Sequence, residues 1–254
     1  MWRFYYTIGR NMLRLPGIIA AMRHRADHPE QYSEEECYEY ARYVVNLMQK
    51  TGHIKTQGFG TENLPKQGGY MLYPNHQGKY DAYGIVAVHE KPCTVVMDKA
   101  KSYIIFIREL IDLLKAKRMD IHDTRQALGI IKEVAAEVAQ GRRYILFPEG
   151  GYAKDQKNRL GDFKAGCFKI VLKSKAPIVP VALIDSWKVF NSWQLLPVTT
   201  QVHFLEPIYY EEYKDLKTVQ VAELVKTRIQ QKIDEVCGAS SQDCRKSGKN
   251  GTDK

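Results

Sequence analysis

His76 and Asp81 are the two residues of this sequence whose types and spacing best suit proton transfer. Histidine is the usual general base near neutral pH, and a carboxylate on its other ring nitrogen fixes its tautomer and orientation. The two residues lie five positions apart, so they cannot be neighbours on one face of a straight helix. They can meet if His76 lies in a turn after a strand and Asp81 begins the next helix, and Gly78 makes such a turn easier. We therefore predict a histidine base that is held by an aspartate.

The sequence offers this base no obvious enzyme nucleophile, because it contains no G-x-S-x-G motif. In serine hydrolases the same pairing activates a serine hydroxyl of the enzyme. Here the hydroxyl that His76 activates would belong to a substrate. The spacing by itself is weak evidence, since a chain with seven histidines matches so short a pattern by chance in roughly one case in three.

Two further motifs place polar groups at the ends of apolar runs. Residues 147–150 read F-P-E-G and put the Glu149 carboxylate after a strand-like run, where proline and glycine end the strand and expose the acid. Residues 163–166 read F-K-x-G and put Lys164 beside the start of a predicted helix, a setting that suits phosphate binding. Taken singly, a solvated glutamate in a turn and a solvated lysine are the commoner interpretations. Their chemistry depends on whether the fold brings them to His76.

Strands and helices are predicted to alternate along the chain, which would place these motifs after strands. The predicted strands cover 53–59, 69–73, 93–97, 143–147, 178–183 and 201–205. The predicted helices, the first opened by a capping box at Ser33 and Glu36, cover 33–50, 81–89, 99–117, 124–140, 165–173 and 218–236. This alternation predicts an α/β fold with a mostly parallel central sheet flanked by helices.

Residues 2–25 are predicted to form a basic amphipathic helix or a helix pair, which Pro16 and Gly17 kink or divide. Apolar residues recur along this stretch at helical spacing: Phe4, Ile8, Met12, Leu15, Ile19 and Met22. Its positive charges are Arg3, Arg10, Arg14, Arg23 and Arg25, and no acidic residue precedes Asp27. Such a segment suits either a membrane interface or packing on the protein's own core, and the pattern favours neither.

The length of 254 residues, with 44% hydrophobic and 26% charged residues, is enough for one large domain with appendages. We predict an N-terminal helical segment over 1–50 and an α/β domain over 51–237. From Gly238 onward small and polar residues dominate, so residues 238–254 are predicted to be a disordered tail.

A formal net charge of +9 admits nucleic acid, anionic lipid and phosphorylated small molecules as partners. Base-stacking aromatic motifs and a helix-turn-helix pattern are not evident, so no nucleic-acid partner is predicted. The five cysteines include no C-x-x-C pair, which argues against a metal finger and favours reduced cytoplasmic thiols. No apolar run reaches about eighteen residues, so a simple membrane-spanning helix is not predicted.

Taken together, the motifs resemble those of the glycerolipid acyltransferase family, which includes the 1-acyl-sn-glycerol-3-phosphate acyltransferases. Asn75, His76 and Asp81 match the family's N-H-x4-D block, and residues 147–150 match its F-P-E-G block in full. The run 178–183 matches a short V-P-V-like strand, and the F-K-x-G motif falls at the usual place. The blocks follow the family's order and spacing over about residues 50–210.

This resemblance implies that His76, held by Asp81, deprotonates a glycerol hydroxyl of a lysophospholipid acceptor. The resulting alkoxide would attack the thioester carbonyl of acyl-CoA or acyl-carrier protein. Glu149, Gly150 and Lys164 would bind the glycerol phosphate. The resemblance also implies a reaction that requires no metal and no organic cofactor. The resemblance further implies a role in phospholipid synthesis at the cytoplasmic face of the cell membrane, with segment 1–50 as a peripheral or monotopic anchor on the membrane surface.

Three departures from the family pattern leave the acceptor open. Gly78 replaces a serine that many members have, and Gly151 and Tyr152 stand where a threonine–arginine pair is common. Ile121 stands where the family's second block usually has an arginine, and Arg118 or Arg125 are the candidates to replace it. Acylation of another lysolipid or lipid hydroxyl therefore remains an alternative, as does a lipid- or phosphate-binding protein that has lost catalysis.

Overall fold

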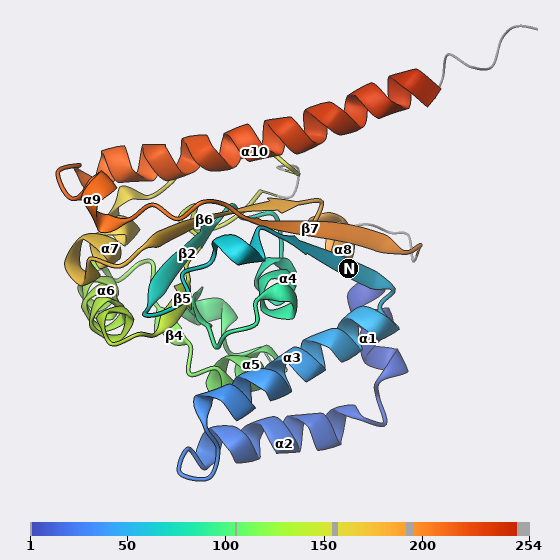
Figure 1. Ribbon diagram of the computed structural model, residues 1–254. Coiled ribbons are helices and arrows are strands. Elements are labelled where there is room, and N and C mark those ends of the chain that lie inside the picture. Colours follow the sequence, from blue (N-terminus) through green and yellow to red (C-terminus); the bar gives the residue numbers. More distant parts are fainter. Residues whose placement is uncertain (1, 105, 154–156, 192–195, 248–254) are drawn as a thin grey trace, which may run out of the picture.

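The structure is a computed structural model that describes residues 2–104, 106–153, 157–191 and 196–247. Its centre is a seven-stranded sheet with the strand order β1-β7-β6-β2-β5-β3-β4 (Figure 1). The strands are β1 Ile54–Phe59, β2 Tyr70–Pro74, β3 Thr94–Asp98, β4 Lys117–Met119, β5 Arg143–Ile145, β6 Ile178–Ile184 and β7 Val198–Phe204. Neighbouring strands are parallel, except that β6 and β7 are antiparallel. The predicted α/β fold with a mostly parallel sheet is confirmed.

Helices surround this sheet. The α-helices are α1 Trp2–Arg10, α2 Leu15–Asp27, α3 Glu34–Thr51, α4 Asp81–Val88, α5 Ile107–Leu113, α6 Thr124–Ala139, α7 Lys169–Ser174, α8 Lys188–Asn191, α9 Tyr210–Tyr213 and α10 Thr218–Ser247. Short 3-10 helices are η1 Thr61–Asn63, η2 Lys99–Lys101 and η3 Ala165–Phe168. Figure 1 shows α10 on one side of the sheet and α2, α3 and α5 on the other.

Strand β2 lies inside the sheet and contributes to an apolar layer on each face. Met71 and Tyr73 pack in the layer that includes α6, α7 and α10, whereas Tyr70 and Leu72 pack in the layer that includes α2 to α5. Successive side chains of a strand point to opposite faces, so a strand that is covered on both faces needs apolar residues at every position. The carboxyl end of β2, where His76 follows, is thereby held inside a rigid scaffold.

The first two helices, α1 and α2, form a helix pair that shares the core with the rest of the chain. The predicted helix pair is confirmed, but the break lies at residues 11–14, before Pro16 and Gly17. Pro16 lies in the first turn of α2, where its missing N–H costs no hydrogen bond. The capping box at the start of α3 is also present, since the Ser33 side chain accepts from the Glu36 N–H and the Glu36 side chain accepts from the Ser33 N–H. Met22 of α2 and Tyr38 of α3 are buried in the layer that covers β2.

Three of the five N-terminal arginines contact parts of the chain outside their own helix. Arg3 is fully buried, and its guanidinium donates to two backbone carbonyls, including that of Gly52 at 2.7 Å. Arg23 forms an ion pair of 2.6 Å with the buried Glu109 of α5. Arg25 lies over the rings of two tyrosines. These contacts fasten the helix pair to the rest of the molecule.

The predicted single helix over 99–117 is wrong. The chain instead forms η2, a turn, α5 and then the edge strand β4. Phe106 adopts a φ of 74°, which no helix interior accepts, and the buried Glu109 carboxylate caps α5 by accepting the Phe106 N–H at 2.6 Å. A local apolar pattern cannot reveal that residues 117–119 gain parallel pairing with β3.

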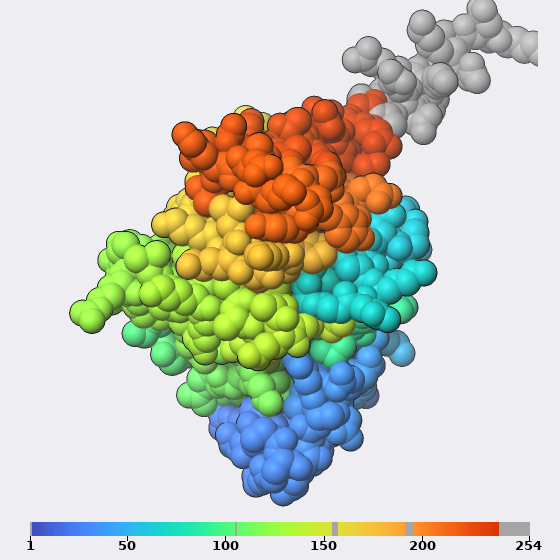
Figure 2. All heavy atoms as spheres, turned by 60° about the vertical axis from the view of Figure 1, so that its left-hand side comes forward, coloured from blue at the N-terminus to red at the C-terminus, as the bar shows by residue number. Residues whose placement is uncertain are grey.

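The last helix continues beyond Val236, where the sequence predicted its end. Helix α10 runs to Ser247, so the prediction of disorder is wrong for residues 238–247, and residues 248–254 lie outside the described residues. Gly238 costs a helix only about 1 kcal/mol, and no proline follows it in the helix. In Figure 2 the N-terminal helices and α10 lie at opposite ends of the molecule. Among the described residues, no helix combines the length and apolarity that a membrane crossing requires.

Candidate active site

His76 and Asp81 meet at the carboxyl end of β2. The imidazole Nδ1 lies 2.7 Å from Oδ2 of Asp81, the first residue of α4. Because a carboxylate only accepts, Nδ1 must carry the hydrogen of this bond, which leaves the Nε2 lone pair free to act as a base. Nε2 has no hydrogen-bond partner within the described part of the chain, and the side chain of His76 is 19% exposed. A substrate hydroxyl can therefore reach it.

Asp81 is fully buried and accepts four hydrogen bonds. Besides the imidazole, Oδ2 accepts the N–H groups of Gln77 at 2.5 Å and Gly78 at 2.9 Å. The other oxygen, Oδ1, accepts from the hydroxyl of Ser186. These donors satisfy the buried carboxylate without water, and its position at the start of α4 is favoured by the helix dipole. The aspartate is thus built to orient and stabilise the histidine.

Two aromatic rings fix the plane of the imidazole. Phe147 stacks on it with ring centroids 4.2 Å apart, and Tyr152 packs edge-on at 4.6 Å. Burial, helped by the charge of Asp81, raises the pKa of the Tyr152 hydroxyl, which therefore keeps its proton at neutral pH. Tyr152 is therefore part of the wall around the imidazole.

The F-P-E-G and F-K-x-G motifs lie beside the histidine. The Glu149 carboxylate accepts the backbone N–H of His76 at 2.8 Å and that of Gly161 at 3.0 Å, so it joins two loops. Gly150 has a φ of 69°, and a Cβ at this position would stand 2.6 Å from the Nζ atom of Lys164. The fold therefore gathers the predicted residues Glu149, Gly150 and Lys164 at His76, although their binding of an acceptor stays a prediction.

On its other side the histidine loop is tied to the end of β6. The Asn75 amide donates to the Leu183 carbonyl at 3.1 Å and accepts the Leu183 N–H at 2.7 Å. Gln77 also donates to the Leu183 carbonyl, at 2.7 Å, and accepts the N–H of Ser186 at 3.0 Å. Sequence reasoning missed the roles of Gln77 and Ser186. The only available signal was that each is a polar residue next to the end of a strand.

The two candidate arginines are not brought to the histidine–aspartate pair. Arg118, on the edge strand β4, donates to Asp112 at 2.7 Å and to the hydroxyl of Ser102 at 3.0 Å, and it stacks on Tyr103. Arg125 is exposed in the first turn of α6. Neither contacts the pair in the described part of the chain. The contacts of Arg118 are thus with nearby residues of its own region. That either arginine binds the acceptor stays a prediction.

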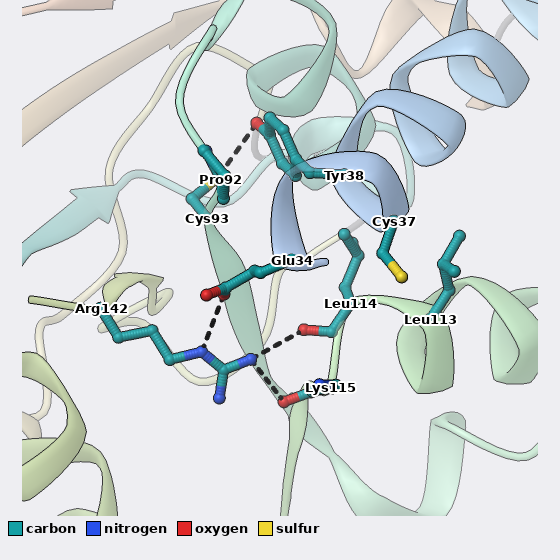
Figure 3. Close-up of a pocket in the computed structure, with 9 residues that line it drawn as sticks. All are labelled: Glu34, Cys37, Tyr38, Pro92, Cys93, Leu113, Leu114, Lys115 and Arg142. Atoms are coloured by element: carbon teal, nitrogen blue, oxygen red, sulfur yellow. Dashed lines mark hydrogen bonds and ion pairs between the residues drawn. The ribbon is translucent and has the colours of Figure 1, made fainter. Parts of the chain in front are cut away.

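A small pocket lies at the amino ends of β3 and β5, the end of the sheet opposite to His76 (Figure 3). Cys93 and Arg142, which immediately precede β3 and β5, line it together with Cys37 of α3. Burial raises the pKa of Cys93 to about 12, so this thiol is protonated and unreactive. His76 and Glu149 lie after the carboxyl ends of their strands, so this pocket is not part of their site. No cluster of metal-binding side chains with three or more members occurs in the described ranges.

Comparison with known proteins supports the reading of the motifs. A family model described as Acyltransferase matches residues 55–184, which is just over half of the 254 residues. The matched range contains His76, Asp81, Glu149, Gly150 and Lys164.

Two relatives and one solved structure are similar to this chain. The 1-acyl-sn-glycerol-3-phosphate acyltransferase of Saccharomyces cerevisiae is 25% identical over 204 residues, which cover 77% of this chain and 65% of the yeast protein. The chloroplastic 1-acyl-sn-glycerol-3-phosphate acyltransferase BAT2 of Brassica napus is 31% identical over 140 residues, which cover 53% of this chain and 39% of that protein. The chain thus spans less than two thirds of the length of either relative. The crystal structure of the 1-acyl-sn-glycerophosphate acyltransferase PlsC from Thermotoga maritima shares the fold, with a TM-score of 0.71, 16% identity, and coverage of 92% of this chain and 94% of that chain.

Proposed function

Because this chain belongs to the acyltransferase family, we propose that it is an O-acyltransferase acting on the free hydroxyl of 1-acyl-sn-glycerol 3-phosphate in phospholipid synthesis. The acyl donor is acyl-CoA or acyl-carrier protein. The observation that carries this proposal is the 2.7 Å contact between His76 Nδ1 and Asp81, with Nε2 left open toward a substrate. The names of the relatives from yeast and Brassica napus support the choice of acceptor.

The site suits direct transfer without an acyl-enzyme intermediate. Nε2 of His76 takes the proton of the acceptor hydroxyl while the oxygen bonds to the thioester carbonyl carbon. The tetrahedral intermediate then collapses, the carbon–sulfur bond breaks, and the imidazolium returns its proton to the leaving thiolate. Asp81 stabilises the imidazolium between these two steps, as the aspartate does in a serine hydrolase.

Lys164 and the turn at Gly150 are the groups that we assign to the acceptor phosphate. The ammonium of Lys164 lies over Gly150, where any side chain would collide with it. A positive charge beside the base can hold a phosphate while the neighbouring hydroxyl faces Nε2.

Acylation of another lysolipid or lipid hydroxyl is the second candidate function. It is favoured by Ile121, which is 45% exposed where the family usually has an arginine, and by Tyr152, which packs on the base. A site with fewer cations for the phosphate discriminates less strongly against acceptors that lack one.

A panel of acceptors and donors tests the proposal. The full chain is incubated with lysophosphatidate, other lysophospholipids and monoacylglycerol, each with acyl-CoA or acyl-carrier protein, and the products are identified by mass. We expect phosphatidate as the main product. A different main product would replace the proposed acceptor with the second candidate. No product with any pair, from protein that binds lipid vesicles, would favour a lipid-binding protein without catalysis.

We also propose that the protein works at the cytoplasmic face of the cell membrane, as a peripheral or monotopic protein. Support comes from large apolar side chains that α1 and the following turn leave in solvent: Trp2 (59% exposed), Tyr5 (60%), Met12 (67%) and Leu13 (95%). Arg10 and Arg14 are exposed beside them and carry the charge that attracts anionic lipid.

Leu13→Asp tests this membrane contact. Burying a leucine contributes about 1.5–3 kcal/mol, so we expect the variant to bind vesicles containing anionic phospholipid at least about tenfold more weakly. Val219→Asp is the matched control, since Val219 is 66% exposed on α10 at the other end of the molecule (Figure 2). Equal co-sedimentation of wild type and both variants would contradict the proposal.

A further inference from the structure

Ser186 lies behind the histidine–aspartate pair, two residues after the end of β6. It is only 4% exposed, and its hydroxyl donates to Oδ1 of Asp81, the oxygen that does not contact the imidazole. The Gln77 Oε1 atom is a second acceptor within reach, at 3.2 Å. The charged carboxylate is the stronger acceptor, so the single hydroxyl proton points to Asp81.

Gln77 holds Ser186 in this position. Its Oε1 atom accepts the backbone N–H of Ser186 at 3.0 Å, while its Nε2 atom donates to the Leu183 carbonyl at 2.7 Å and to Asn158 at 2.9 Å. The amide is therefore paired at both ends and cannot turn. Because Gln77 directly follows His76, the same loop carries the base and fixes the hydroxyl behind it.

The Ser186 hydroxyl gives Oδ1 of Asp81 a donor, which changes how strongly Oδ2 interacts with the imidazole. Oδ2 accepts from the imidazole and two backbone N–H groups, and Ser186 is the side-chain donor on Oδ1. A donor on Oδ1 fixes the rotation of the carboxylate and draws negative charge away from Oδ2. Less charge on Oδ2 means weaker stabilisation of the protonated imidazole.

We propose that Ser186 is a positioning residue of the general base, acting through Asp81. It orients the carboxylate toward His76 and, by donating to Oδ1, weakens the hold of Oδ2 on the protonated imidazole. This inference rests on the proposed role of His76 as the base. The structure carries it through the buried hydroxyl, its bond to Oδ1 and the Gln77 amide that holds it.

The test is Ser186→Ala in the full chain, with two readouts. The first is the pH dependence of kcat/KM for acyl transfer, whose acid limb we expect to move upward by about 0.5 to 1 pH unit. The second is the titration of the His76 imidazole by NMR, which needs no turnover and should move by the same amount. Ser174→Ala is the matched control, because the Ser174 hydroxyl is buried without a hydrogen-bond partner among the described residues.

Ser186→Cys keeps nearly the same volume with a weaker donor, and it should give a smaller shift in the same direction. It provides the readout if Ser186→Ala does not fold. A lower kcat with an unmoved acid limb and an unmoved NMR titration would overturn the inference, because it would indicate a structural role only. An NMR titration that moves in a protein without acyl transfer would uphold the inference and instead contradict the proposed function.

Discussion

Glu149→Gln separates two roles for this residue that the family motif does not distinguish. The structure gives Glu149 a holding role, since its carboxylate accepts the N–H of His76 at 2.8 Å and the N–H of Gly161 at 3.0 Å. A glutamine keeps the shape of the side chain, but one of its two polar atoms becomes a donor. In either orientation of the amide, one of the two backbone N–H groups then faces another donor.

The size of the effect follows from this lost bond. A hydrogen bond to a charged group contributes about 1.5–3 kcal/mol, and each 1.4 kcal/mol is about a factor of ten in population. We therefore expect the loop around His76 to leave its productive position, with kcat lower by about tenfold to a hundredfold. The KM for the acceptor should change by no more than about twofold, because this contact is made without substrate.

The assay is steady-state acyl transfer with the acceptor varied, alongside thermal unfolding to check the fold. Asp162→Asn is the control, since it removes a fully exposed carboxylate next to Gly161 without touching His76. A raised KM for lysophosphatidate with an unchanged kcat would refute the holding role. It would show instead that Glu149 binds the acceptor.

Three further predictions concern stability and specificity. Burial lowers the pKa of His89 from 6.5 to about 4. As pH falls, the imidazole is therefore protonated in the unfolded chain before it is protonated in the folded protein. Urea unfolding should show that this group lowers the free energy of unfolding by about 2 kcal/mol between about pH 7.5 and about pH 5. Replacing His89 by glutamine should reduce this loss, and an unchanged pH dependence would contradict the prediction. Ile121→Arg restores a cation at the family's second block, and we expect a lower KM for lysophosphatidate but not for monoacylglycerol; equal changes for both would argue against a phosphate contact. Gly150→Ala forces alanine to a φ of 69° and pushes on Lys164, so it should cost about 1–2 kcal/mol in urea unfolding, whereas Gly151→Ala, with nothing within 4 Å, should cost less.

The parts of the fold that the sequence predicted well are those with local causes. The capping box at Ser33 and the proline in the first turn of α2 set helix starts through neighbouring residues alone. The segment 99–117 shows the limit, because its apolar run is typical of a helix. Pairing with β3 and the Glu109 cap on Phe106 decide its structure, and both depend on tertiary contacts.

The candidate site divides in the same way. Predicted residues such as His76 and Glu149 were visible because they belong to short motifs next to strand ends. Ser186 was not, because its contact with Asp81 joins positions 105 residues apart and exists only once β6 pairs with β2. The burial of Arg3 was hidden for the same reason, because its contact with Gly52 joins positions 49 residues apart and has no local signature.

The most direct test of the central claim is the rate of acyl transfer by His76→Ala. A general base contributes about a hundredfold to ten-thousandfold to the rate, so we expect kcat with lysophosphatidate to fall by at least about a hundredfold at unchanged thermal stability. His24→Ala is the control, because His24 is an exposed histidine of α2, outside the loops that hold the pair, and should keep the wild-type rate. Turnover by His76→Ala at the wild-type rate, with both acyl-CoA and acyl-carrier protein as donors, would contradict the account.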